Sequence, residues 1–245
     1  MAFEPQERVV SRTHEAEVDL GLRSYMLRVY NYMTGGLALT GVVAYLVLTV
    51  PALQSLFFTV SSNGRIGMSM LGWIAFLAPL GLVFFLSFKV ASIKASTAQA
   101  LFWGYAALMG IGLTPLLMIY TGASVARVFF ITAATFGAMS LYGYTTKRDL
   151  SGWGSFLFMG LIGIIIASIV NIFVVSSMMS FIISVVGVLV FTGLTAYDTQ
   201  KIKESYIADD DGQTMTKKAV MGALELYLDF INLFIMLLRL IGDRR

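Results

Sequence analysis

Hydrophobic residues fall in seven long runs that are separated by short polar stretches. The runs cover approximately residues 29–50, 66–88, 98–120, 125–144, 153–175, 178–197 and 219–238. About 20 mostly apolar residues in a helix cross the ~30 Å hydrocarbon core of a bilayer, and each run is about that long. The pattern therefore predicts an all-α membrane protein, a bundle of seven transmembrane helices embedded in a lipid bilayer.

The last run, Ala219–Leu238, differs from the others because it carries carboxylates. Glu225, Asp229 and Asn232 recur at helical spacing, so their side chains share one stripe of the helix. A charged carboxylate at the centre of a bilayer costs at least ~2.5 kcal/mol. Such a side chain needs protein or water to face, so we expect the last helix to lie at the centre of the bundle.

Composition supports the membrane class. Hydrophobic residues make up 58% of the chain and charged residues 13%, with a mean hydropathy of +0.81, whereas soluble domains hold about 25% charged residues. We divide the chain into a polar N-terminal tail (1–28), one transmembrane domain (29–240) and a short C-terminal tail (241–245). The second half of the first tail, from about Val18, is expected to form a helix lying on the membrane.

Several kinds of chemistry are missing from the sequence. The chain has no cysteine, which excludes disulfides and thiolate metal sites, and its one histidine, His14, lies in the charged tail. No nucleophile–base pair occurs within the apolar runs, so we do not expect an enzyme, and no cofactor is implied. The basic residues are scattered over loops and not gathered on one face, which does not indicate nucleic acid binding.

The placement of basic residues predicts the orientation in the membrane. The N-terminal tail and the second, fourth and sixth connections carry most of the Lys and Arg residues, whereas the alternate connections carry only Arg65, only Arg127, and none. Positively charged loops stay in the cytoplasm, so the N-terminus is predicted to be cytoplasmic. Seven full spans then place the arginines at the C-terminus outside, against the rule; the alternative is one re-entrant segment.

Two apolar runs that follow each other in the sequence carry the candidate functional acids. Asp198 lies at the inner end of the sixth run, and Glu225 and Asp229 lie in the seventh. Two carboxylates brought together in a low dielectric cannot both be ionised cheaply, so they share a proton and can sense pH. When both are ionised they attract a cation, and oxygen ligands are those that Ca²⁺ prefers.

A plainer interpretation stays open from the residues alone. Asp198 is three residues before Lys201 and fits a solvated acid at a helix end. Asp229 lies about 16 Å deeper than the flanking lysines at ~1.5 Å per residue. The two acids meet only if the sixth helix continues past Lys203 or if an aqueous cavity dips inward.

Three stretches resemble the Bax inhibitor-1 family, the transmembrane Bax-inhibitor-motif proteins. They are TGLTAYDTQKIK (192–203), LELYLDFINLFIMLLRL (224–240) and FGAMSLYGYTTKRDLSGWG (136–154), the last of which is similar to the bacterial inner-membrane branch. The resemblance extends from about Arg23 to the end of the chain. It implies a fold in which six helices surround the last one, in a bacterial inner membrane.

The resemblance also implies a function and its residues. It implies a pH-sensitive calcium leak governed by a pair of aspartates, which are Asp198 and Asp229 at the matching positions of the motifs. In the family an arginine at the cytoplasmic end of the second helix latches onto this pair. The corresponding stretch LSFKVASIK has no arginine, so Lys89 is the nearby candidate, although lysine lacks the bidentate fork of arginine.

We therefore consider two hypotheses about function, one with ion transport and one without. The first is a passive, proton-gated pathway for cations, Ca²⁺ in particular, in which Asp198 and Asp229 bind the ion and the proton, with Glu225, Asn232 and Lys89 as accessory residues. The second is a membrane-embedded regulator that binds other membrane proteins, such as a quality-control protease, without transport. In the second case the acid pair contributes only to stability.

Overall fold

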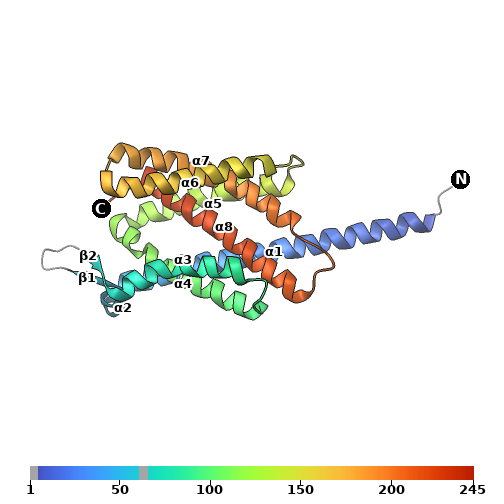
Figure 1. The fold of residues 1–245 in the computed structure, drawn as a ribbon, viewed down its shortest axis with the longest axis horizontal. Helices are drawn as coiled ribbons and strands as arrows, with labels where there is room; N and C mark the ends of the chain where they lie inside the picture. The colour runs from blue at the N-terminus through green and yellow to red at the C-terminus, as the bar shows by residue number, and fades with distance from the viewer. Residues whose placement is uncertain (1–4, 61–65) are drawn as a thin grey trace.

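A computed structural model describes residues 5–60 and 66–245 and is built almost wholly of helices (Figure 1). A two-stranded antiparallel hairpin joins the second and third helices. The elements are α1 (Pro5–Thr49), α2 (Pro51–Phe57), β1 (Phe58–Val60), β2 (Ile66–Met68), α3 (Met70–Lys89), α4 (Ala95–Ile119), α5 (Gly122–Thr145), α6 (Ser151–Val174), α7 (Ser177–Glu204) and α8 (Gly212–Ile241).

Within the described part of the chain, six helices are long and apolar enough to cross a membrane. They are α1 from Asp19 onward and the five helices α3 to α7. The prediction of an all-α, multi-pass membrane protein is confirmed to this extent. The seventh apolar run forms α8, which differs from the rest in its burial: half of its 30 residues are buried, whereas α6 buries three of 24. α8 packs against α1, α4, α5 and α7.

α1 crosses the predicted boundary between the N-terminal tail and the first span without a break. It is one helix from Pro5 to Thr49, and its first part extends away from the other helices (Figure 1). The residues from about Val18 are helical, as expected, but they belong to one helix that begins earlier, at Pro5. Their position relative to the membrane stays a prediction. No proline lies between Pro5 and Pro51, and the Glu, Arg, Leu and Ala residues of the tail favour the helical state, so nothing in this segment interrupts the helix.

The connection between α1 and α3 contains structure that the hydrophobic pattern did not predict. Pro51 begins the short helix α2, a position where its missing N–H costs nothing. The hairpin then pairs Phe58 with Met68, so the second apolar run begins as a strand and not as a helix. α3 starts at Met70. Ser69 caps its N-terminus, because the Ser69 hydroxyl accepts a hydrogen bond from the Gly72 N–H at 3.0 Å.

α7 and α8 pack antiparallel with a marked stagger. A Cβ placed on Gly222 would lie 3.0 Å from Ile202 Cγ2, so these two residues face each other closely. Ile202 is in the last turn of α7, which ends at Glu204, whereas Gly222 lies nearly three turns into α8, which begins at Gly212. The first turns of α8 therefore project past the end of α7.

The C-terminal end of α8 returns to the connection between α4 and α5. The Thr121 N–H donates to the Asp243 carbonyl at 3.0 Å, and the Arg245 N–H donates to the Ile119 carbonyl at 2.9 Å. Arg127 forms an ion pair with the Asp243 carboxylate at 2.9 Å. The C-terminus thus lies at the end of the bundle opposite to the start of α1 (Figure 1).

Candidate functional site

A cavity of about 480 Å³ lies between α6, α7 and α8 and is lined by both polar and apolar residues. Most of the polar residues that line it come from the two motif stretches of α7 and α8. The lining residues are Gly154, Ser155, Phe158 and Leu161 of α6, Phe191, Leu194, Tyr197, Asp198 and Lys201 of α7, and Glu225, Leu228, Asp229 and Asn232 of α8. The structure thus places four of the five residues singled out in the sequence on one cavity wall.

Asp198 and Asp229 contact each other across the α7–α8 interface. Their carboxyl groups are in hydrogen-bond contact, Asp229 is only 4% exposed, and the Asp198 side chain is 15% exposed. An ionised carboxylate only accepts hydrogen bonds, so a direct bond between two carboxyl groups requires a proton on one of them. This arrangement can hold one shared proton.

One oxygen of Asp229 is left without a partner. Its Oδ2 atom is buried and accepts no hydrogen bond from any residue that the structure describes. A buried polar atom without a partner costs about 1–3 kcal/mol, so such atoms are rare and need an explanation. Asp229 lines the cavity, and this oxygen would gain a partner if a proton, a water molecule or a cation reached it from there.

The stagger of the two helices explains why the acids meet. Counting residues from Lys217 and Lys218 places Asp229 much deeper in the membrane than Asp198. This count assumes that α8 begins level with the end of α7, whereas the first turns of α8 lie beyond the end of α7. Measured from the level of Ile202 and Gly222, the two acids are at a similar depth. α7 ends at Glu204, one residue past Lys203, so the stagger of the helices and not a longer α7 accounts for the contact.

Lys201 is the cation of the site, a role that was not predicted from the sequence. Its Nζ lies 3.0 and 3.1 Å from the two carboxylate oxygens of Glu225 and 3.9 Å from Asp198 Oδ1. The spacing of Asp198 and Lys201 by three residues on one helix was the available signal. The Glu225 side chain is 32% exposed, so Glu225 and Lys201 form the more open part of the cavity wall.

The two remaining candidates differ in their relation to the cavity. Asn232 lines it, and its Nδ2 donates to the Leu228 carbonyl at 2.9 Å within α8. Lys89 is exposed in the last turn of α3 and is absent from the cavity wall. Over residues 5–60 and 66–245 its side chain makes no ion pair, so the latch role of Lys89 stays a prediction.

The aspartate pair does not belong to a larger cluster of metal ligands. Among the residues that the structure describes, no group of three or more His, Asp and Glu side chains is arranged to hold a metal ion. The charges of the site are three carboxyl groups, from Asp198, Glu225 and Asp229, and the one cation of Lys201. This arrangement can hold a proton and can interact with a passing cation.

The sequence model of a protein family described as "Inhibitor of apoptosis-promoting Bax1" matches residues 22–245 of the chain. The chain belongs to the Bax inhibitor-1 family. The match includes all of α3 to α8, and with them every residue that lines the cavity. The α7 and α8 stretches on which the resemblance to the Bax inhibitor-1 family rested are those that bring Asp198 and Asp229 together.

Relatives in bacteria are similar over almost their whole length. The inner membrane protein YbhL of Escherichia coli is 48% identical, with 92% of this chain and 94% of that protein aligned. An uncharacterized protein of Rickettsia prowazekii is 49% identical over 93% of this chain and 92% of its own length. An uncharacterized membrane protein of Streptococcus pyogenes is 41% identical over 91% of this chain and 94% of its own. This Bax inhibitor-1 family protein thus has bacterial relatives that are themselves described as membrane proteins.

Proposed function

We propose that this protein is a pH-sensitive, passive pathway for cations, Ca²⁺ in particular, across a bacterial inner membrane. The observation that supports this most strongly is the contact of Asp198 with Asp229 on the wall of a cavity, with one buried carboxylate oxygen unpartnered. Ionisable groups inside a membrane bundle are expensive, and they commonly mark ion or proton pathways.

The proposed architecture is a seven-span bundle in which α8 crosses the membrane at the centre. Packing of α8 against four helices and the burial of half of its residues support the central position. An odd number of crossings also agrees with chain ends that lie at opposite ends of the bundle (Figure 1).

The proposed orientation puts the N-terminus in the cytoplasm. The basic connections gather at one end of the bundle: Lys217 donates to the Ala91 carbonyl at 3.0 Å, and Lys203 donates to the Tyr144 carbonyl at 2.8 Å. Positively charged loops stay on the cytoplasmic side. The cavity with Lys201 and Glu225 then opens toward the cytoplasmic half of the protein.

In the proposed mechanism the aspartate pair changes charge with pH. With one shared proton the pair carries a single negative charge and joins α7 to α8 through a hydrogen bond. Loss of that proton leaves two adjacent carboxylates, which repel each other in a low dielectric and attract a divalent cation. Cation passage is therefore coupled to the protonation of the pair, and both states depend on the two acids being together.

Calcium flux into liposomes tests this proposal. We expect purified protein in liposomes with an internal calcium indicator to give a flux that changes across a pH series. Asp229→Asn and Asp198→Asn should abolish the pH response, because an amide cannot exchange the shared proton. Asp209→Asn is the matched control, since Asp209 is an exposed acid on the loop between α7 and α8.

Two results would overturn the proposal. One is equal flux with no pH response in the unmodified protein and in Asp229→Asn. The other is flux at the level of empty liposomes for all variants, which favours the regulator hypothesis; crosslinking in membranes should then recover a stoichiometric membrane-protein partner.

A further inference from the structure

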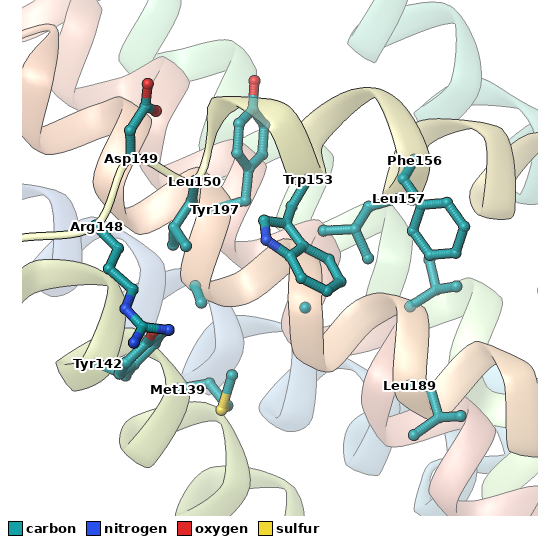
Figure 2. A pocket seen from close by; sticks show the side chains of 13 residues that line it. Met139, Tyr142, Arg148, Asp149, Leu150, Trp153, Phe156, Leu157, Leu189 and Tyr197 are labelled. Carbon is teal, nitrogen blue, oxygen red and sulfur yellow. The ribbon is translucent and has the colours of Figure 1, made fainter. Parts of the chain in front are cut away.

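A second cavity, of about 450 Å³, opens between α5, α6 and α7 (Figure 2). We call it the α5–α7 groove, defined by Tyr142, Arg148, Trp153, Phe156, Leu189 and Gly193. It lies at the end of the bundle where the basic connections gather. Tyr197 lines both this groove and the cavity that contains Asp198 and Asp229, but the residues that define the groove do not line that cavity. Nothing in the proposed cation pathway uses this groove.

The wall of the groove is apolar and open to the surroundings. Trp153, Phe156 and Leu189 line it, yet each is more than 60% exposed. They belong to α6 and α7, which are among the helices apolar enough to cross a membrane. Large apolar side chains exposed in this way along a membrane-spanning helix contact acyl chains. Trp153 and Tyr142 near the helix ends are aromatic residues of the kind that sits at the headgroup level.

Arg148 supplies a cationic side chain at the polar end of the groove. Figure 2 shows the Arg148 side chain directed toward Tyr142, which also lines the groove. Its backbone is held in place by Gln200, whose Nε2 donates to the Arg148 carbonyl at 2.8 Å and whose Oε1 accepts from the Leu150 N–H at 2.8 Å. Within the part of the chain that the structure describes, the Arg148 guanidinium has no ion pair and no hydrogen bond.

The other charges of this loop do not neutralise Arg148. Asp149 points away from it in Figure 2, and its carboxylate accepts a hydrogen bond from the Ser151 N–H at 2.8 Å. Hydrogen bonds from the Ser151 side chain and backbone hold the pKa of the Asp149 carboxyl below its usual value. Lys147 is exposed and adds positive charge next to the groove but does not line it. The groove thus combines an apolar wall with one unpaired guanidinium at its interfacial end.

We propose that the α5–α7 groove binds an anionic phospholipid. An acyl chain lies along the wall formed by Leu189 and Phe156, and the phosphate of the headgroup accepts hydrogen bonds from the Arg148 guanidinium. Guanidinium groups match phosphate oxygens in a bidentate geometry, which gives this position its preference for a phosphate that carries net negative charge. Trp153 borders the site at the headgroup level and reports on its occupancy.

Fluorescence quenching by brominated lipids tests the proposal on the full-length chain. The chain has three tryptophans, so the background Trp73→Phe/Trp103→Phe leaves Trp153 as the only one. The probes are phosphatidylglycerol and phosphatidylcholine with brominated acyl chains, titrated into vesicles of unbrominated phosphatidylcholine. We expect brominated phosphatidylglycerol to quench Trp153 at lower mole fraction, with about a fivefold preference, the size expected for one basic residue at an anionic surface.

Two variants separate a specific site from general charge attraction. Arg148→Gln should bring the preference for phosphatidylglycerol close to one, whereas Lys147→Gln, with the same change in charge on the neighbouring residue, should leave most of it. Equal quenching by the two lipids in the parent protein overturns the proposal, whatever the folding of the variants. Equal loss in both variants also overturns it, because that result shows diffuse attraction by the loop.

Discussion

The close approach of α5 to α7 at Gly143 makes a quantitative prediction about stability. A Cβ on Gly143 would lie 2.2 Å from the Ala196 carbonyl oxygen and 2.9 Å from its carbonyl carbon. Carbon and oxygen atoms in contact are usually separated by more than about 3.3 Å, so Gly143→Ala forces the two backbones apart by roughly 1 Å. Ala196 precedes Asp198 by two residues, so the contact also helps to place α7.

The magnitude follows from two opposing effects. Overpacking costs about 1–3 kcal/mol, and the upper part of that range applies because the obstacle is backbone and not a mobile side chain. Alanine is favoured over glycine in a helix by about 1 kcal/mol. We therefore expect Gly143→Ala to lower the free energy of unfolding by about 2 kcal/mol, which is about 4–8 °C in the melting temperature.

Thermal unfolding in detergent, followed by circular dichroism, is the assay. The control is Gly137→Ala in the same helix, where a Cβ would meet no atom within 4 Å. This control should match or slightly exceed the melting temperature of the unmodified protein, since only the helix preference of alanine acts there. Equal melting temperatures for the two variants would refute the close approach on which the reasoning rests.

Other parts of the structure give further expectations. Lys201→Gln removes the cation that lies 3.0 Å from Glu225 and 3.9 Å from Asp198. Without this competing charge Ca²⁺ should bind the carboxylates more tightly, so half-maximal flux should occur at a lower Ca²⁺ concentration. An unchanged concentration would contradict this. Glu225→Gln should reduce flux less than Asp229→Asn does, because Glu225 lies at the open part of the wall and is not in the shared-proton contact; a larger loss would speak against the roles assigned to the two acids. Arg127→Ala should change the free energy of unfolding by about 0–1 kcal/mol, since both partners of the Arg127–Asp243 ion pair are more than half exposed. Single cysteines at Asp209 and Arg245 in this cysteine-free chain should react with impermeant reagents from opposite sides of the membrane; labelling from the same side would contradict seven crossings.

The hydrophobic pattern predicted the long helices because a membrane span needs both length and apolar residues. It failed between Val50 and Ser69, where short elements leave no such signature. Pro51 and the pairing of Phe58 with Met68 determine that connection, and strand pairing depends on residues from both sides of a turn. Helix α1 was predicted too short because the tail is polar, yet polarity does not end a helix and only a proline or a cap would have done so.

The acid pair could be proposed from the sequence, but its geometry could not. Counting residues from the flanking lysines assumes that both helices begin at the same level, and the stagger that sets Gly222 opposite Ile202 violates that assumption. Lys201 was not singled out from the sequence, since the resemblance directed attention to Lys89. Lys201 contacts Asp198 and Glu225 because it lies one turn from Asp198 on α7 and faces α8, and such a contact between helices depends on their packing.

Infrared difference spectroscopy across a pH series tests whether Asp198 and Asp229 share a proton, because it detects protonated carboxyl groups in the folded protein. We expect a protonated-carboxyl band that changes with pH over the range in which calcium flux changes. This band should be lost in Asp229→Asn and kept in Asp209→Asn. A band that is identical in the unmodified protein and in Asp229→Asn would contradict a proton shared between Asp198 and Asp229.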